Sequence, residues 1–213
     1  MNSRTHLDPD ALPPYPRLWA RWTATAAASA AAGDQWGPRV LPRLAWFDNG
    51  SGGGSVLRVL PGGTAAWWGE VTAGDTPGAP AIPFGYWWQS GRWHLSEPLA
   101  LAHRAPAIPR VWSTGETVDT VTGLLDDERR RATAAMLVYA AEAGSVTPAL
   151  VAEVFGAPGL DPEAAAGQLT LGGLLTGPRR VPHDPRRTSP GADIDGLPAD
   201  GVCEAGGLIP ARR

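Results

Sequence analysis

Residues 40–60 read VLPRLAWFDNGSGGGSVLRVL, and this stretch decides the class of fold. Two apolar runs, each of strand length, are separated by Asp48-Asn49-Gly50 and a segment of serine and glycine. An Asn-Gly step favours a tight turn because both residues tolerate the left-handed conformation. We therefore predict strands over Val40–Phe47 and Ser55–Leu60, joined by a loop and not by an interdomain linker.

The strand pattern continues downstream to about residue 112. Ala65–Val71 reads as a strand or a short helix. Phe84–Trp88 and Arg92–Leu95 form a predicted hairpin across a polar turn, and Pro106–Trp112 is predicted to be a further short strand. The middle of the chain therefore predicts four to six antiparallel strands.

Helical patterns lie on both sides of this region. Tyr15–Ala32 is a predicted helix, with proline in its first turn and Gly33 as its end. Four more helices are predicted over residues 117–125, 126–143, 147–156 and 161–173. Two of them begin with a capping residue followed by proline, at Thr147 and Asp161. The expected apolar face of the 126–143 helix consists of Ala132, Met136, Val138 and Tyr139.

These elements define an α+β protein: a small antiparallel β-sheet with an N-terminal helix and a C-terminal helical subdomain. We expect a flexible arm over residues 1–14, a Trp-rich sheet domain over 15–115 and a helical subdomain packed on it over 116–176. Residues 177–213 are rich in proline, glycine, arginine and aspartate, with isolated apolar residues only. Such a segment buries too little apolar surface to offset its ordering entropy, so a disordered tail is expected.

The composition argues against nucleic acid binding, an internal disulfide and a membrane span. All 18 basic side chains are arginine, and the formal net charge of −3 gives no basic surface for phosphate, so we do not expect nucleic acid binding. The single cysteine, Cys203, cannot form an internal disulfide. No window approaches the roughly 20 apolar residues of a membrane span. We expect a cytoplasmic protein without membrane contact.

The motifs of known catalytic and cofactor sites are missing. The glycine-rich residues 50–54 lack the lysine and the following helix of a phosphate-binding loop. The histidines show no spacing that requires a metal, although His94, Glu97 and His103 could be combined into one site. We therefore predict no cofactor, no metal and no catalytic residue. An enzyme or carbohydrate binder built around Asp48, Glu70 and His94 remains open.

Ten tryptophans are the most informative feature of the composition. If these segments are strands, one member of each adjacent pair can enter the core, and the other is either exposed or covered by helices on the second face of the sheet. At least one of the three hairpin tryptophans should have an exposed ring. Tryptophan is favoured in protein interfaces because it is large and stiff and carries one hydrogen-bond donor. The predicted partner-binding residues are Trp68, Trp87, Trp88 and Trp93 with the acidic residues Asp48 and Glu70.

Residues 45–69 also carry a family pattern. Trp46, Asp48 and Ser51-Gly52-Gly53 are followed by a strand that ends in Leu60-Pro61, and then by Trp67-Trp68-Gly69. This order resembles the opening of the immunity proteins of actinobacterial polymorphic toxin systems. The proline that follows the glycine pair in that pattern is missing here. The resemblance implies a protein that neutralises a cognate toxin by binding it.

From the sequence we expect the protein to bind another protein without enzymatic activity, and a toxin is one candidate partner. One alternative is a structural subunit of a larger homo- or hetero-oligomer. Another is a DNA-binding regulator, since the helices expected over 147–156 and 161–173 resemble a helix-turn-helix in their order. The second of these helices contains no basic residue that could contact DNA.

Overall fold

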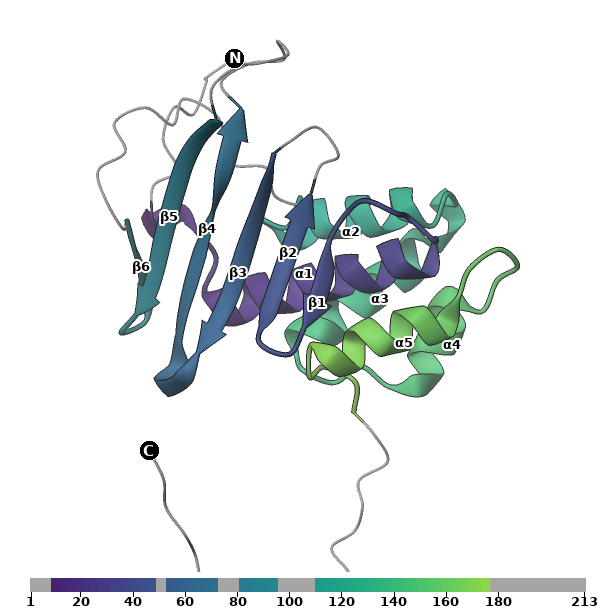
Figure 1. Cartoon of the computed structure of the whole chain (residues 1–213). Coiled ribbons are helices and arrows are strands. Elements are labelled where there is room, and N and C mark those ends of the chain that lie inside the picture. Colours follow the sequence, from purple (N-terminus) through teal and green to yellow (C-terminus); the bar gives the residue numbers. More distant parts are fainter. Residues whose placement is uncertain (1–8, 49–52, 73–80, 96–109, 177–213) are drawn as a thin grey trace, which may run out of the picture. The chain divides into compact units, whose positions relative to one another are not determined.

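The computed structural model describes residues 9–48, 53–72, 81–95 and 110–176 of the 213-residue chain. This part has the predicted α+β architecture, with one antiparallel sheet and helices that pack against it (Figure 1). The strands are β1 (Arg39–Leu41), β2 (Leu44–Asp48), β3 (Gly54–Leu60), β4 (Thr64–Thr72), β5 (Ala81–Gln89) and β6 (Arg92–Leu95). Each strand pairs with the next one along the chain, so the sheet is a six-stranded meander.

The first hairpin was not expected from the sequence. Val40–Phe47, predicted as one strand, is two strands that reverse at Pro42 and Arg43, with Leu41 opposite Leu44. Proline fixes the φ angle that the first turn position requires. Arg43 then takes the left-handed conformation, with φ 63°. The prediction of a single strand was wrong because the turn has arginine where glycine or asparagine would announce it.

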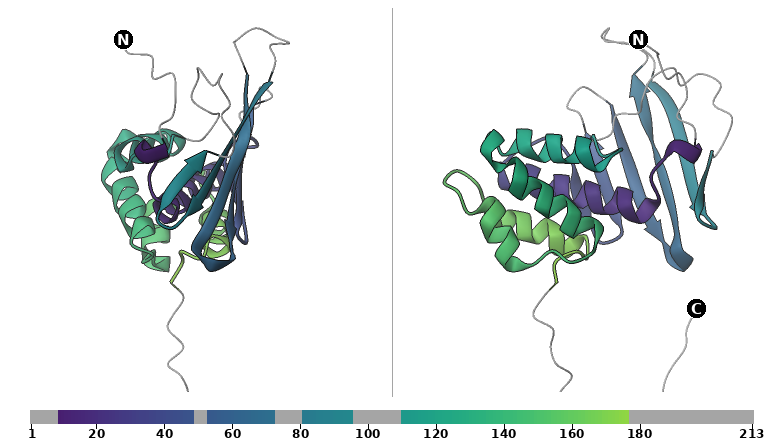
Figure 2. Two further views of the ribbon diagram at one scale, coloured as in Figure 1. Left: turned by 90° about the vertical axis from the view of Figure 1, so that its left-hand side faces the viewer. Right: turned by 180° about the vertical axis from the view of Figure 1, so that it is seen from behind.

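Helix α1 (Tyr15–Ala31) lies between the sheet and the other helices (Figure 2). Leu18, Trp22 and Ala26, spaced one turn apart, pack on the inner face of the sheet. The alanines on its other side, including Ala24 and Ala28, pack against the remaining helices. The sheet and the helical layer therefore share one central helix, and its small side chains allow close approach from both sides.

The helical layer consists of α2 (Thr114–Leu124), α3 (Arg131–Glu142), α4 (Pro148–Phe155) and α5 (Pro162–Leu171). A capping box starts α2, in which Ser113 accepts from the Glu116 amide at 3.1 Å and Glu116 accepts from the Ser113 amide at 3.2 Å. The predicted caps of α4 and α5 are confirmed, because the side chains of Thr147 and Asp161 accept backbone hydrogen bonds. Helix α2 begins at Thr114, whereas the sequence predicted a helix from Thr117.

Two expectations for this layer were wrong. The helix predicted from Asp126 begins only at Arg131, after a 3-10 turn η3 (Glu128–Arg130), since Asp126 has φ 49° and interrupts the helical path. The predicted apolar face of α3 is also misplaced. Met136 and Tyr139 are 51% and 62% exposed, whereas a face shifted around the helix is buried, consisting of Ala134, Leu137, Val138 and Ala141.

The strand predicted over Pro106–Trp112 falls largely outside the described residues. Its residues 106–109 lie outside the described part of the chain, and residues 110–112 have no strand pairing. Val111 is nevertheless fully buried in the sheet-side core. Arg21 of α1 holds this segment in place: its Nη1 donates to the Trp112 carbonyl at 2.7 Å and its Nη2 donates to Thr114 Oγ1 at 3.1 Å.

Arg21 also forms the main buried ion pair among the described residues. Its Nε lies 2.7 Å from Glu142 Oε1, and the side chains are 6% and 15% exposed. Thr114 donates to the same carboxylate oxygen at 2.8 Å. One arginine therefore links α1, the start of α2 and the end of α3.

The two ends of the chain are only partly described. The predicted arm is packed over residues 9–14, because 3-10 turn η1 (Pro9–Ala11) precedes the buried Leu12 and the Pro13 carbonyl accepts from Trp93 Nε1 at 2.8 Å. Residues 1–8 and the predicted tail over 177–213 lie outside the described residues. None of the helices in the described ranges combines the length and the apolar character that a membrane crossing requires.

Candidate functional site

Strand alternation sorts the adjacent tryptophans of the sheet onto opposite faces, as predicted. Trp67 is fully buried and Trp68 is 42% exposed, while Trp88 is buried and Trp87 is 40% exposed. Trp93 lies on the buried face with Trp88, and their ring centroids are 5.5 Å apart. The prediction that the hairpin exposes at least one ring is confirmed by Trp87. The rings of Trp88 and Trp93 lie in the core, so neither is available to a partner in the isolated chain.

Trp68 and Trp87 share the face of the sheet that is turned away from the helices, whereas Trp36, 55% exposed, lies between α1 and β1 and outside the sheet. When the sheet is seen edge-on, the helices of the described residues lie on one side of it (Figure 2). We call the other side the open face. By strand alternation and register, its residues include Leu41, Leu44, Trp46, Asp48, Val56, Arg58, Ala66, Trp68, Gly85, Trp87, Arg92 and His94.

Aromatic and small residues alternate across the open face. Trp46, Val56 and Trp68 follow one another in a cross-strand row that continues to Gly85. In the neighbouring row, Ala66 lies opposite Trp87. Each exposed indole on β4 and β5 therefore stands beside a residue with little or no side chain, and space for an incoming group remains next to it.

A hollow of about 440 Å³ opens where this aromatic row meets the end of β2. Trp46 and Trp68 line it from two strands apart, with Val56 between them and Asp48 at its end. Gly54 is required there, since a Cβ atom at this position would lie 2.7 Å from the Phe47 carbonyl oxygen. The hollow can receive an apolar or planar side chain between two indole rings.

On the open face, acidic and basic residues lie toward opposite ends of the strands. Asp48 and Glu70 both occupy register positions opposite Gly54, which places the two acidic candidates in one cross-strand row. Arg58 is exposed in the row of Trp87 and His94. A partner therefore meets the Asp48 carboxylate at one end of the aromatic patch and the guanidinium groups of Arg58 and Arg92 at the other.

A rigid aromatic core supports the open face from below. Trp67 stacks on Tyr86 with ring centroids 5.2 Å apart, and its edge-on contact with Trp112 has a centroid distance of 5.5 Å. Burial raises the pKa of the Tyr86 hydroxyl above its ordinary value. Trp22 of α1 donates from Nε1 to the Trp46 carbonyl at 3.4 Å. The strand that carries Trp46 is thus held by the central helix.

The residues proposed for an alternative catalytic site do not converge. Asp48 lies on β2 and His94 on β6, with β3, β4 and β5 between them. At about 4.8 Å per strand, their backbones are at least about 19 Å apart. Glu97 and His103 lie outside the described residues, and the described part holds no cluster of three potential metal ligands.

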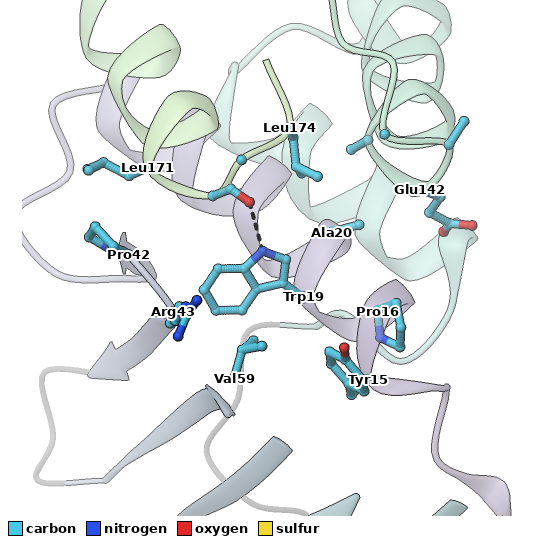
Figure 3. A pocket seen from close by; sticks show the side chains of 15 residues that line it. Tyr15, Pro16, Trp19, Ala20, Pro42, Arg43, Val59, Glu142, Leu171 and Leu174 are labelled. Atoms are coloured by element: carbon cyan, nitrogen blue, oxygen red, sulfur yellow. Dashed lines mark hydrogen bonds between the residues drawn. The ribbon is translucent and has the colours of Figure 1, made fainter. Parts of the chain in front are cut away.

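A second, larger cavity lies on the helix side of the sheet. Its volume is about 600 Å³, and its walls come from the first turns of α1, the β1–β2 turn, β3 and the C-terminal ends of α3 and α5 (Figure 3). Trp19, Arg43 and Glu142 are among its lining residues. No local sequence signal points to this cavity, because five separate segments build it. The alternation of β2 could have placed Trp46 on the open face if the strand had been recognised as starting at Leu44.

No family model, no curated protein and no solved structure matches this chain.

Proposed function

We propose that this chain is a non-enzymatic protein-binding protein that engages its partner through the open face of the sheet. The observation that carries the proposal is the exposure of Trp68 and Trp87, at diagonal positions on the neighbouring strands β4 and β5, on a face that no described helix covers. Large exposed apolar patches are rare on monomeric proteins and mark interaction sites. Tryptophan is among the residue types that dominate interface hot spots.

The size of the face suits a macromolecule better than a small ligand. Six strands about 4.8 Å apart make a face about 24 Å wide, and five residues along a strand add about 17 Å. The resulting patch of about 400 Å² is half of the roughly 800 Å² that each partner contributes to a standard interface. A protein that also contacts the rim of the sheet would complete it.

The chemistry of the face favours a protein over a nucleic acid. The Asp48 carboxylate lies at one end of the patch and the guanidinium groups of Arg58 and Arg92 lie at the other, so the face is not a uniformly basic surface. The helix-turn-helix alternative is also disfavoured, because α5 contains no basic residue and packs against α1 in the helical layer. Glu163 at its first turn would repel phosphate.

A cognate toxin is the partner that the sequence resemblance favours. Trp46, Asp48 and Trp68, which belong to the immunity-protein pattern, all lie on the open face. An immunity protein of this kind would block the toxin by covering its active site. Co-expression with the toxin should then restore growth of the host, and the variant Trp68→Ala/Trp87→Ala should fail to restore it.

Site-specific photocrosslinking tests the proposal. The crosslinking residue p-benzoylphenylalanine replaces Trp87 in one full-length variant and the exposed Tyr139 of α3 in a control variant. After irradiation in the source cells, the position-87 variant should yield one discrete covalent adduct with a foreign protein, and the position-139 variant should not. An adduct of twice the chain mass would instead support an assembly subunit. Equal adducts from both positions, or none from position 87, would contradict the proposal.

A further inference from the structure

The larger cavity on the helix side has the dimensions of a small-molecule site. Its volume of about 600 Å³ lies within the range of about 300–1,000 Å³ that is usual for ligand pockets. Its lining is mostly apolar and includes Val59 of β3, which points to the inner side of the sheet, with Leu171 and Leu174 from the end of α5. None of its lining residues belongs to the open face.

Trp19 forms the centre of this cavity and has a fixed orientation (Figure 3). Its Nε1 donates to the Gly172 carbonyl at 2.9 Å, which satisfies the only donor of the indole. Gly172 is needed for this approach, since a Cβ atom there would lie 2.3 Å from the Thr23 side chain. The half-buried ring is therefore a preformed apolar surface for a ligand.

The two charged residues of the cavity, Arg43 and Glu142, lie on opposite sides of Trp19 in Figure 3. They differ in whether they are already paired within the protein. The Glu142 carboxylate is already bound by Arg21 at 2.7 Å and by the Thr114 hydroxyl at 2.8 Å. Arg43 is exposed and makes no ion pair with any residue of the described ranges. The unneutralised charge at the cavity is therefore positive.

The backbone conformation of Arg43 adds an independent observation. Its φ of 63° lies in the left-handed region that glycine adopts freely and that other residues adopt only with strain. The turn between β1 and β2 would form more easily with glycine. Strained non-glycine positions concentrate at functional sites, and this one places a guanidinium at the mouth of an apolar cavity.

We infer that this cavity binds a small molecule that combines a flat apolar body with one anionic group. The body packs against Trp19, Val59 and Leu174, and the anion, a carboxylate, sulfonate or phosphate, pairs with Arg43. Arginine suits this role because its planar guanidinium can donate two parallel hydrogen bonds to such a group. The site is independent of the protein interface proposed above.

Two fluorescent probes test the inference on the full chain. The first is 8-anilinonaphthalene-1-sulfonate, and the second is N-phenyl-1-naphthylamine, which lacks the sulfonate but has the same aromatic body. The variant Arg43→Gly removes the charge and relieves the backbone strain. It should weaken sulfonate-probe binding at least about fivefold. Binding of the neutral probe should stay within about twofold of the original chain.

Two further variants show whether the probes bind in the cavity or on the open face. Ala143→Trp places an indole in the cavity from an exposed lining position and should abolish binding of both probes. Trp68→Ala/Trp87→Ala, on the open face, should leave both affinities unchanged. The inference is overturned if the original chain binds neither probe, if Arg43→Gly weakens both probes equally or neither, or if Ala143→Trp leaves binding intact.

Discussion

Replacing Arg21 by methionine should destabilise the protein by about 3 kcal/mol, which is the low end of the effect of breaking a buried ion pair. The change keeps most of the apolar volume of the side chain. It leaves the Glu142 carboxylate, only 15% exposed, with the Thr114 hydroxyl as its donor. It also removes the donor that binds the Trp112 carbonyl at 2.7 Å.

Urea unfolding followed by circular dichroism measures this loss. Arg131→Met is the matched control, because Arg131 pairs with Asp119 while both side chains are more than half exposed, and such a pair contributes about 1 kcal/mol or less. The double variant Arg21→Met/Glu142→Leu should recover part of the stability, since no uncompensated charge remains. Equal losses for Arg21→Met and Arg131→Met would refute the reasoning.

Three further predictions concern stability. Arg43→Gly should stabilise the fold by about 1 kcal/mol, because glycine adopts the φ of 63° without strain, and a lower midpoint in urea unfolding would contradict this. Gln168→Ala should cost about 1–3 kcal/mol, since the amide of the buried Val40 donates to Gln168 Oε1 at 2.7 Å; Gln168→Glu keeps an acceptor and should cost less. Burial raises the pKa of Tyr86, so its contribution to the free energy of unfolding is complete below about pH 10 and falls at higher pH, as the unfolded chain loses the proton first. Unfolding at pH 9 and pH 11 should show a smaller decrease for Tyr86→Phe than for the original chain.

The elements that the sequence predicted well have local signals. Thr147 and Asp161 cap their helices through their own side chains, and a proline follows each of them, so both starts are encoded within four residues. Strand alternation is also local, and it separated Trp67 from Trp68 before any partner strand was known. The same alternation places one tryptophan of each adjacent pair on the exposed side of the sheet.

The elements that the sequence did not predict depend on tertiary contacts. The buried side of α3 is chosen by its neighbours in the helical layer, so Met136 and Tyr139 are exposed although they continue an apolar pattern. Nothing local shows that the β1–β2 turn can hold Arg43 in the left-handed region. The cavity around Trp19 exists only after five segments converge, so no single stretch encodes it.

The most direct test of the open face as the binding surface is to measure its affinity for the partner protein that photocrosslinking identifies. Isothermal titration calorimetry compares the original chain with two variants that each lose two exposed large side chains, Trp68→Ala/Trp87→Ala on the open face and Met136→Ala/Tyr139→Ala on α3. Two hot-spot tryptophans should together be worth at least about 100-fold in Kd. We expect that loss for the open-face variant, and a Kd within about twofold of the original for the α3 variant. A partner that binds all three proteins with the same Kd would contradict the assignment of the open face as the binding surface.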